Sequence, residues 1–406
     1  MTKETKNTKA FNNTEIPSNW KIKKLGALVE IVSGVSPSLF NLDVVGKYPY
    51  LKVEDLNNCE KYQVSSREFS NDEKQLVPKN SVIFPKRGAA ILNNKVRINS
   101  VAVQMDSNLM AIYPKSEDLS FEYLYYQITF EQLHKIADTS TIPQINNKHI
   151  IPYSFPLPPL PEQKAIAQVL STADAAIHTT EKLIAQKELR KKWLMQQLLT
   201  GKKRLKGFEG EWKEMHIRDV AKEVSIRNKS DKQLTVLSCT KYDGLVPSLE
   251  YFGRKIYADD VSTYKIVPKH HFAYATNHIE EGSIGYQEIL DEALISPMYT
   301  VFKTDKTVND NFFYKLLKSH PLVYQYQNRM EGSIDRRGGL RWDGFSIIKI
   351  KLPLYEEQTA IAQVLQAADK EISLLKAKAE KLRQQKKGLM QVLLTGKKRL
   401  KIKNTI

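Results

Sequence analysis

The sequence predicts an α+β protein made of two mixed α/β globules, each followed by a long helix. The main observation is a repeat: segment 157–205 recurs as 352–400 without a gap, at a constant offset of 195 residues (352 minus 157). A period this long excludes a solenoid of about 20 to 50 residues per repeat and indicates two copies of one module. Length agrees, because 406 residues suffice for about two to four domains with cores of their own.

The first globule is expected at residues 1–157, with 1–14 as a polar, disordered leader that lacks the apolar run of a signal peptide. Trp20 marks its start, and short β-like runs with turn residues follow. An aromatic segment from Phe121 has a helical pattern, and an alternating apolar strand at 150–157 closes the globule.

The first long helix belongs to a spacer segment expected at 158–206, after a proline-rich approach that cannot be helix interior. Glu162 places an acid in the first turn, where the helix dipole favours it. From Ile166 the seam positions follow steps of four and three, which is the spacing of a coiled coil. Gly201 is expected to end the helix in the left-handed conformation.

The second globule is expected at 207–351, where fainter landmarks recur in the same order, from Trp212 to a closing strand at 345–352. The second spacer helix, with a basic tail, occupies 352–406 and is expected to end at Gly396. We interpret the pattern as an old duplication whose globules diverged while the helices did not.

Each helix predicts a rod of roughly 50 Å with one apolar stripe, at 1.5 Å per residue. The other copy is the expected partner of this stripe; two separate surface helices are the alternative. Thr180 and Lys187 interrupt the first seam, so looser packing is expected there. We assign these residues to the helix seam and subunit interface: Glu162, Gln163, Ile166, Leu170, Ile177, Ile184, Leu194, Glu357, Gln358, Ile361, Leu365, Ile372, Leu375, Leu382 and Leu389.

The charge balance is unusual, with a net charge of +17 and a pI near 9.4. Nucleic acid is the natural partner of such a chain, although a generic basic protein is the alternative. Cys59 and Cys239 lie in different halves without CxxC spacing, which argues against a disulfide framework or zinc site and fits a reducing, cytoplasmic location. No apolar run approaches the roughly 18 residues of a membrane span.

Catalytic and metal-binding signals are missing from the sequence. It contains no GxxxxGK[ST] loop, no GxGxxG after a strand and no Asn-Pro-Pro-aromatic run. Glu211 and Lys213 imitate part of a nuclease site but lack an upstream Asp on a paired strand. His270, His271 and His278 are close in sequence, yet we expect no metal there because carboxylate or Cys partners at metal spacing are missing.

Basic and amide-rich loops recur at matching places in the two globules. Arg, Asn and Gln pair bidentately with base edges, whereas Lys, Ser and Thr mainly hold phosphates. Any one loop could be ordinary surface, but four in two matching pairs predict DNA contacts. The candidate DNA-binding residues are Lys86, Arg87, Asn93, Asn94, Lys95, Thr139, Ser140, Thr141, Gln144, Asn146, Lys241, Thr276, Asn277, His278, Ser333, Arg336, Arg337 and Arg341.

Basic runs also end both helices, at 202–206 and 397–403. They are either solvated helix ends that complement the dipole or a repeated contact with a partner.

These motifs resemble the specificity (S) subunit of a type I restriction–modification system over the full length of the chain. The resemblance is carried by LPPLPEQKAIAQVL and LPLYEEQTAIAQVL, each ending in LLTGKKRL, with support from the two Trp motifs and the Gly332–Arg336 loop. One departure is Leu354-Tyr355-Glu356 in place of Pro159-Leu160-Pro161, so the second hinge is expected to be more pliant.

The resemblance implies an antiparallel coiled coil, a pseudo-two-fold molecule and a bipartite, asymmetric DNA target. It also implies two methyltransferase (M) subunits and restriction (R) subunits as partners. S-adenosylmethionine, ATP and Mg²⁺ would be used by those partners and none bound by this chain. The chain would then be a non-catalytic, sequence-specific DNA-binding subunit whose helices set the spacer between half-sites. The alternatives are a single-chain enzyme and a stand-alone DNA-binding repressor or scaffold.

Overall fold

The computed structural model describes residues 8–11, 14–138, 142–230, 232–330 and 339–400. The chain divides into two compact units. The first unit contains residues 1–181 and 377–406, and the second contains residues 182–376. Both divisions fall inside a long helix, so each unit combines one globule with parts of both helices.

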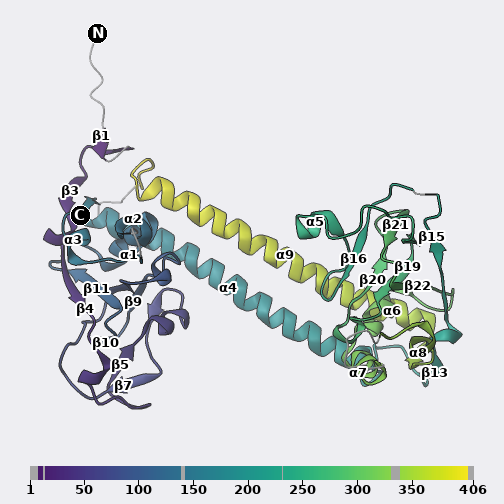
Figure 1. The fold of residues 1–406 in the computed structure, drawn as a ribbon. Helices are drawn as coiled ribbons and strands as arrows, with labels where there is room; N and C mark the ends of the chain where they lie inside the picture. Colours follow the sequence, from purple (N-terminus) through teal and green to yellow (C-terminus); the bar gives the residue numbers. More distant parts are fainter. Residues whose placement is uncertain (1–7, 12–13, 139–141, 231, 331–338, 401–406) are drawn as a thin grey trace, which may run out of the picture. The chain divides into compact units, whose positions relative to one another are not determined.

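The first unit contains a five-stranded sheet in the order β4–β11–β8–β9–β6 and a three-stranded sheet in the order β10–β5–β7 (Figure 1). Two further pairs are the β1–β2 hairpin and β3–β12. Its strands are β1 (Thr8–Phe11), β2 (Thr14–Pro17), β3 (Lys21–Lys24), β4 (Val29–Ser33), β5 (Tyr48–Leu51), β6 (Tyr62–Gln63), β7 (Glu68–Ser70), β8 (Val82–Pro85), β9 (Arg97–Asn99), β10 (Gln104–Met105), β11 (Leu109–Pro114) and β12 (Ser154–Leu157).

The aromatic helix of the first unit, α1 (Phe121–Glu131), starts where the sequence predicts it. Its N-terminus is capped by Ser120, whose hydroxyl accepts from the Tyr123 backbone N–H at 3.4 Å. Tyr123 and Tyr126 are fully buried. The other helical segments are α2 (Leu133–Ile136), α3 (Asn147–Ile150), η1 (Leu25–Ala27), η2 (Pro37–Leu39), η3 (Val53–Asn57) and η4 (Ala89–Ile91).

One expectation for the N-terminus differs from the structure. Residues 8–11 lie within the expected disordered leader, yet they form β1 and pair antiparallel with β2. The strand is held because Phe11 is buried in the core of the first unit.

The second unit contains a four-stranded sheet in the order β14–β22–β19–β20 and a three-stranded sheet β15–β18–β21, with β16–β17 and β13–β23 as pairs. Its strands are β13 (Lys213–His216), β14 (Ala221–Glu223), β15 (Ile226–Arg227), β16 (Leu237–Thr240), β17 (Gly244–Pro247), β18 (Lys265–Pro268), β19 (His271–Ala275), β20 (Ile284–Gln287), β21 (Glu292–Ile295), β22 (Tyr299–Thr304) and β23 (Lys349–Leu352). Its shorter helices are α5 (Ser248–Phe252), α6 (Asp310–Leu317), α7 (His320–Arg329), α8 (Trp342–Ser346), η5 (Ile217–Asp219) and η6 (Ile279–Glu281).

The duplication predicted from faint landmarks is visible in the sheets. The order β4–β11–β8–β9 in the first unit corresponds to β14–β22–β19–β20 in the second. In each unit the strand after the landmark Trp pairs with the closing strand, as β3 with β12 and as β13 with β23. This pairing brings the two ends of each globule together, at the point where the spacer helix begins.

The spacer helices are α4 (Leu160–Leu198) and α9 (Tyr355–Leu393), each of 39 residues. At 1.5 Å per residue each is about 58 Å long. Gly201 and Gly396 follow the helix ends with φ of 69° in both cases, which confirms the predicted left-handed caps.

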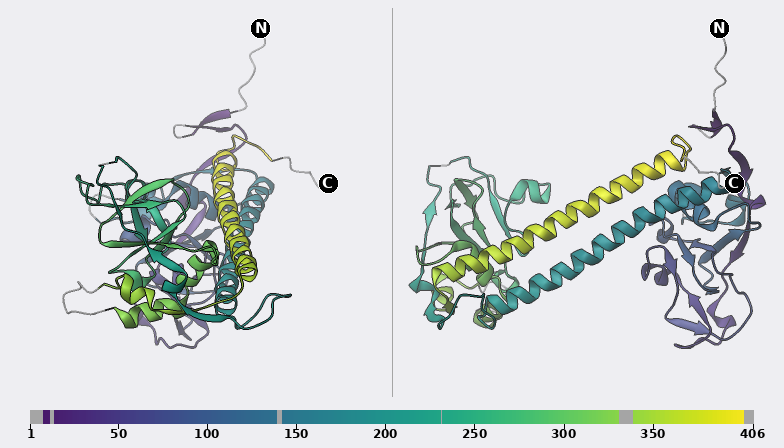
Figure 2. Two further views of the ribbon diagram at one scale, coloured as in Figure 1. Left: turned by 90° about the vertical axis from the view of Figure 1, so that its right-hand side faces the viewer. Right: turned by 180° about the vertical axis from the view of Figure 1, so that it is seen from behind.

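The two helices pack against each other in antiparallel fashion within each unit (Figures 1 and 2). In the first unit Lys386 lies 2.5 Å from Asp174, and Arg399 pairs with Glu162. Residue numbers therefore rise along α4 as they fall along α9. The alternative of two separate surface helices is wrong.

The second unit repeats the antiparallel arrangement. Its ion pairs are Lys187 with Glu371 at 2.5 Å, Lys376 with Glu188 at 2.7 Å, Arg204 with Glu357 at 2.5 Å, and Lys191 with Asp369. Lysines at seam positions thus face carboxylates on the other helix, which explains how the seam tolerates them.

Candidate nucleic-acid interface

Two of the predicted DNA-binding loops lie side by side in the first unit. The Ile145 N–H donates to the Lys86 carbonyl at 2.9 Å, and the Gly88 N–H donates to the Pro143 carbonyl at 2.9 Å. These backbone bonds join the loop after β8 to the loop before α3. The sequence predicted both loops but not their direct pairing.

The second unit joins the corresponding loops in the same way. The Leu340 N–H donates to the Thr276 carbonyl at 2.9 Å, which links the loop after β19 to the start of α8. A Cβ at Gly339 would lie 3.1 Å from Thr276 Oγ1, so the close approach favours glycine. The same surface element, a pair of loops beside one sheet end, therefore occurs in both globules with different side chains.

In the first loop pair, the exposed candidates are Arg87, Asn93 and Asn146. Lys86, Lys95 and Gln144 are half-buried. Burial, together with the charge of Arg87, lowers the pKa of Lys86 below its usual value.

The side-chain amide of Asn94 is engaged in hydrogen bonds within its own globule. Its side-chain nitrogen donates to the Thr129 carbonyl at 2.8 Å, and its oxygen accepts from the Leu133 N–H at 2.9 Å. It also adopts a φ of 49°, a conformation that Asn tolerates better than most residues. These two bonds fix the orientation of the amide and use one of its two N–H groups and one of its two acceptor sites.

In the second loop pair, His278 and Arg341 are exposed, whereas Thr276 and Asn277 are half-buried. Thr276 Oγ1 donates to the Met298 carbonyl at 3.0 Å. Lys241 is exposed in the turn between β16 and β17, where its carbonyl accepts from Lys318 Nζ at 2.8 Å. It belongs to a different loop from the pair.

The remaining candidates lie outside the described residues. They are Thr139, Ser140, Thr141, Ser333, Arg336 and Arg337.

The second loop pair borders a cavity of about 590 Å³, which the sequence did not reveal. Glu223 and Lys265 reach it from β14 and β18, so residues far apart in sequence contribute to its wall. Trp342 could have been suspected, since it directly follows Arg341.

The seam residues at the helix starts are buried by their own chain. Gln163 accepts from the Ser120 N–H at 2.9 Å and donates to the carbonyls of Asp118 and Pro158, both at 2.9 Å. In the second unit, Gln358 makes the equivalent bonds to Asn309, Thr307 and Pro353. These glutamines fix each helix to the N-terminus of the aromatic helix in its globule.

The other seam assignments divide into two groups. Ile166, Leu170, Ile361 and Leu365 are buried in the cores of their units. Ile372 is buried along the helix pair, and Ile177, Ile184, Leu194, Leu375, Leu382 and Leu389 are half-buried. The half-buried group keeps some exposed surface for contact with another subunit, whereas Glu162 and Glu357 are buried.

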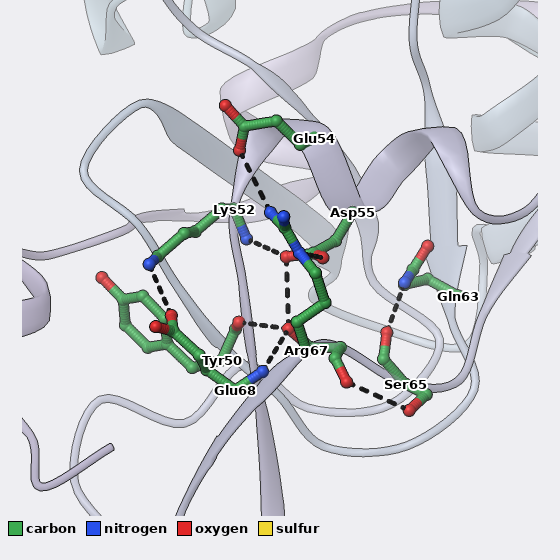
Figure 3. Close-up of polar contacts among 9 residues, drawn as sticks. Tyr50, Lys52, Glu54, Asp55, Gln63, Ser65, Arg67 and Glu68 are labelled. Carbon is green, nitrogen blue, oxygen red and sulfur yellow. Dashed lines mark hydrogen bonds and ion pairs between the residues drawn. The ribbon is translucent and has the colours of Figure 1, made fainter. Parts of the chain in front are cut away.

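Asp55 is a buried carboxylate in the first unit and lies among polar neighbours (Figure 3). Asp55 accepts from the Lys52 N–H at 2.8 Å, from Ser66 Oγ at 3.2 Å and from Arg67 Nε at 3.2 Å. The carboxylate is fully engaged in closing the turn at η3, which is a structural role.

Two exposed or half-buried groups of His and Glu have ligand atoms within 4.8 Å of one another. One contains Glu60, His178 and Glu181, and the other His278, Glu280 and Glu281. The second group differs from the expectation that His278 lacks nearby carboxylates. Such groups are common on protein surfaces, and we assign no metal to either.

Among the residues that the structure describes, no helix combines the length and apolarity needed to cross a membrane.

The family model of the type I restriction modification DNA specificity domain matches the chain twice, at residues 17–188 and 209–384. The MjaVIII specificity subunit of a type I restriction enzyme from Methanocaldococcus jannaschii is 25% identical over 430 aligned positions, covering 97% of this chain and 96% of that protein. The putative MjaX specificity subunit from the same organism is 28% identical over 435 positions, covering 95% of each chain.

A solved structure shares the fold. The S subunit of a type I restriction–modification system from M. genitalium superposes with a TM-score of 0.56 at 16% identity, covering 97% of this chain and 99% of that one.

Proposed function

The chain belongs to the type I restriction modification DNA specificity family, and on this premise we propose how it supplies DNA sequence specificity to such a complex. Each globule reads one half of a bipartite, asymmetric target. The paired helices set the spacer between the halves and dock the methyltransferase subunits.

The observation that carries this proposal is the doubled loop pair. Both globules present two joined loops on the same scaffold, through Lys86–Ile145 in one and Thr276–Leu340 in the other. Their side chains differ, with Arg87 and Asn93 in the first globule and Asn277 and Arg341 in the second. Two globules that share the loop scaffold but differ in its side chains suit the recognition of two different half-sites.

The helices support the spacer role. Each is uninterrupted over 39 residues, and half-sites on one face of B-DNA repeat about every 34–36 Å. A helix of about 58 Å is long enough to span such a repeat.

The chain itself is proposed to be non-catalytic and to work in the cytoplasm. S-adenosylmethionine, ATP and Mg²⁺ are proposed to act on the methyltransferase and restriction subunits. No finding favours a stand-alone repressor.

Methylome sequencing of the native host tests the proposal. Deleting the chain should abolish methylation at one bipartite motif, and supplying the wild-type chain should restore it. The variant Arg87→Ala should weaken or relax only the half-site of the first globule, and Arg341→Ala only that of the second. A methylation pattern unchanged by the deletion would exclude the proposed role.

A further inference from the structure

We propose that the cavity beside the second loop pair receives one unstacked nucleobase of the DNA target, a base that carries an exocyclic amino group. This inference rests on the proposed function, and it adds a local distortion of the duplex to sequence reading by the second globule.

The cavity is built from five separate segments of the second unit. Its volume of about 590 Å³ lies within the range of about 300–1,000 Å³ typical of small-molecule sites. Because the loop after β19 and the start of α8 form part of its rim, the cavity lies where the second globule is proposed to meet DNA. The lining residues used below are Glu223, Lys265, Asn277, Met298, Arg341, Trp342 and Asp343.

The charge of the cavity favours a neutral guest over a phosphate. Two carboxylates, Glu223 and Asp343, balance two cations, Lys265 and Arg341. Lys265 Nζ already donates to the Tyr299 carbonyl at 2.6 Å. A lining without net charge gives no net attraction for a phosphate, whereas a base presents dipoles with no net charge.

The wall provides surfaces on which a base can stack. Trp342 is held by aromatic neighbours, with its ring centre 5.6 Å from that of Phe302 and 5.9 Å from that of Phe345. Met298 adds an apolar contact. Pockets that accept a base removed from the helix typically combine such walls with polar groups for its pairing edge.

The polar groups match an amino-bearing base. The carboxylates of Glu223 and Asp343 can accept from an exocyclic amino group, and the amide of Asn277 can both donate and accept. Thymine lacks an exocyclic amino group and would leave the carboxylates without a donor.

The test uses the complex that the chain forms in its native host and a duplex containing its methylated motif. 2-Aminopurine replaces one base at a time in the half-site of the second globule, because its fluorescence rises when the base unstacks. The base that becomes methylated is left unsubstituted, since methyltransferases flip their own target base. One position should brighten several-fold on binding. The double variant Glu223→Ala/Asp343→Ala removes both carboxylates of the lining. It should lose this rise while binding the duplex with an affinity within about tenfold of wild type.

The control variant is Glu288→Gln, which changes an exposed carboxylate of the second globule outside the cavity lining and should leave the signal intact. Binding without brightening at any position, or brightening that persists in the double variant, overturns the inference alone. Failure of the wild-type complex to bind its motif overturns both the inference and the proposed function. Thermal unfolding of the double variant verifies that it remains folded.

Discussion

At the scale of single residues, the glutamate at the start of each spacer helix joins the two repeats. Glu162 accepts from Trp20 Nε1 at 3.1 Å and from Arg399 Nη2 at 2.7 Å. Arg399 belongs to the basic run that follows α9, so this arginine closes the first unit and is not merely a solvated end.

The second unit repeats the arginine contact but not the indole contact. Arg204 donates to Glu357 through Nε at 2.5 Å and Nη2 at 2.6 Å. The buried Trp212 Nε1 makes no hydrogen bond within the described residues, and the Arg204 guanidinium lies 5.9 Å from the Trp212 ring centre. Glu162 thus satisfies one more donor than Glu357 does.

This asymmetry predicts unequal costs of truncation. Glu162→Ala leaves Arg399 and the Trp20 indole without their acceptor and should destabilise the chain by about 1–3 kcal/mol. For a unit of this size, that corresponds to a fall of about 2–12 °C in the unfolding midpoint. Glu357→Ala should cost less, and Glu356→Ala, an exposed neighbour, almost nothing. Equal shifts for Glu162→Ala and Glu357→Ala in calorimetry would contradict the role given to Trp20.

Asp369 makes the stability of the second unit depend on pH in the acidic range. Burial alone would raise the pKa of Asp369, but hydrogen bonds from Lys191 and Lys315 outweigh it and hold the pKa below the usual value. A carboxylate whose pKa is lower in the folded than in the unfolded state stabilises the folded protein at pH values above its unfolded pKa of about 3.9. This contribution is lost as the pH falls through the folded pKa.

The variant Asp369→Asn should therefore be less stable than wild type at pH 7, and the difference should shrink as pH falls below about 4. Urea unfolding of both proteins between pH 7 and pH 3 measures the effect. Lys370→Ala, at an exposed neighbouring position, serves as the control and should leave the pH profile unchanged. A gap that stays constant with pH would exclude the ion pairs as its cause.

At the scale of elements, periodicity and local signals predicted the helices well. The repeated spacing of four and three predicted α4 and α9, and the aromatic segment from Phe121 predicted α1. Strands β12 and β23 also occur where alternation predicted closing strands. These features depend on residues that are close together in the sequence, which is why a single sequence is enough to predict them.

Features that depend on distant residues were missed. The pairing of β3 with β12 and the cavity wall from Glu223 and Lys265 join segments far apart in the chain. Asn94 was predicted to contact DNA bases, because its two backbone hydrogen-bond partners, Thr129 and Leu133, are distant in sequence and cannot be recognised there.

The expected looseness at Thr180 illustrates the same limit. Its hydroxyl donates to the Ala176 carbonyl of its own helix at 2.8 Å, and the side chain is buried. A hydroxyl satisfied within the helix can occupy a seam position without loosening it.

At the scale of the whole molecule, each globule has its own cores and its own loop pair, so specificity should be modular. Exchanging residues 207–351 for another recognition domain of the family should change one half of the methylated motif and preserve the other. Retaining Trp at position 212 of the exchanged segment, and Gln358 beyond it, keeps two residues that seat the globule on its helix. Methylome sequencing reads the result, and a change in both half-sites would show that the globules are not independent readers.

The proposed spacer role makes the length of the helix pair a second determinant of the target. Inserting one heptad after Ile184 and another after Ala379 keeps the seam in register and adds about 10 Å, close to three base pairs. The duplex also turns by about a third of a turn over that length, so partial activity is expected. Methylation that survives should move to a motif with unchanged half-sites and a longer spacer.

An insertion after Ile184 alone is the control, because it misaligns ion pairs such as Lys191 with Asp369 and should abolish methylation. Full methylation at the original spacer in the double insertion would show that the helices do not set the distance between half-sites.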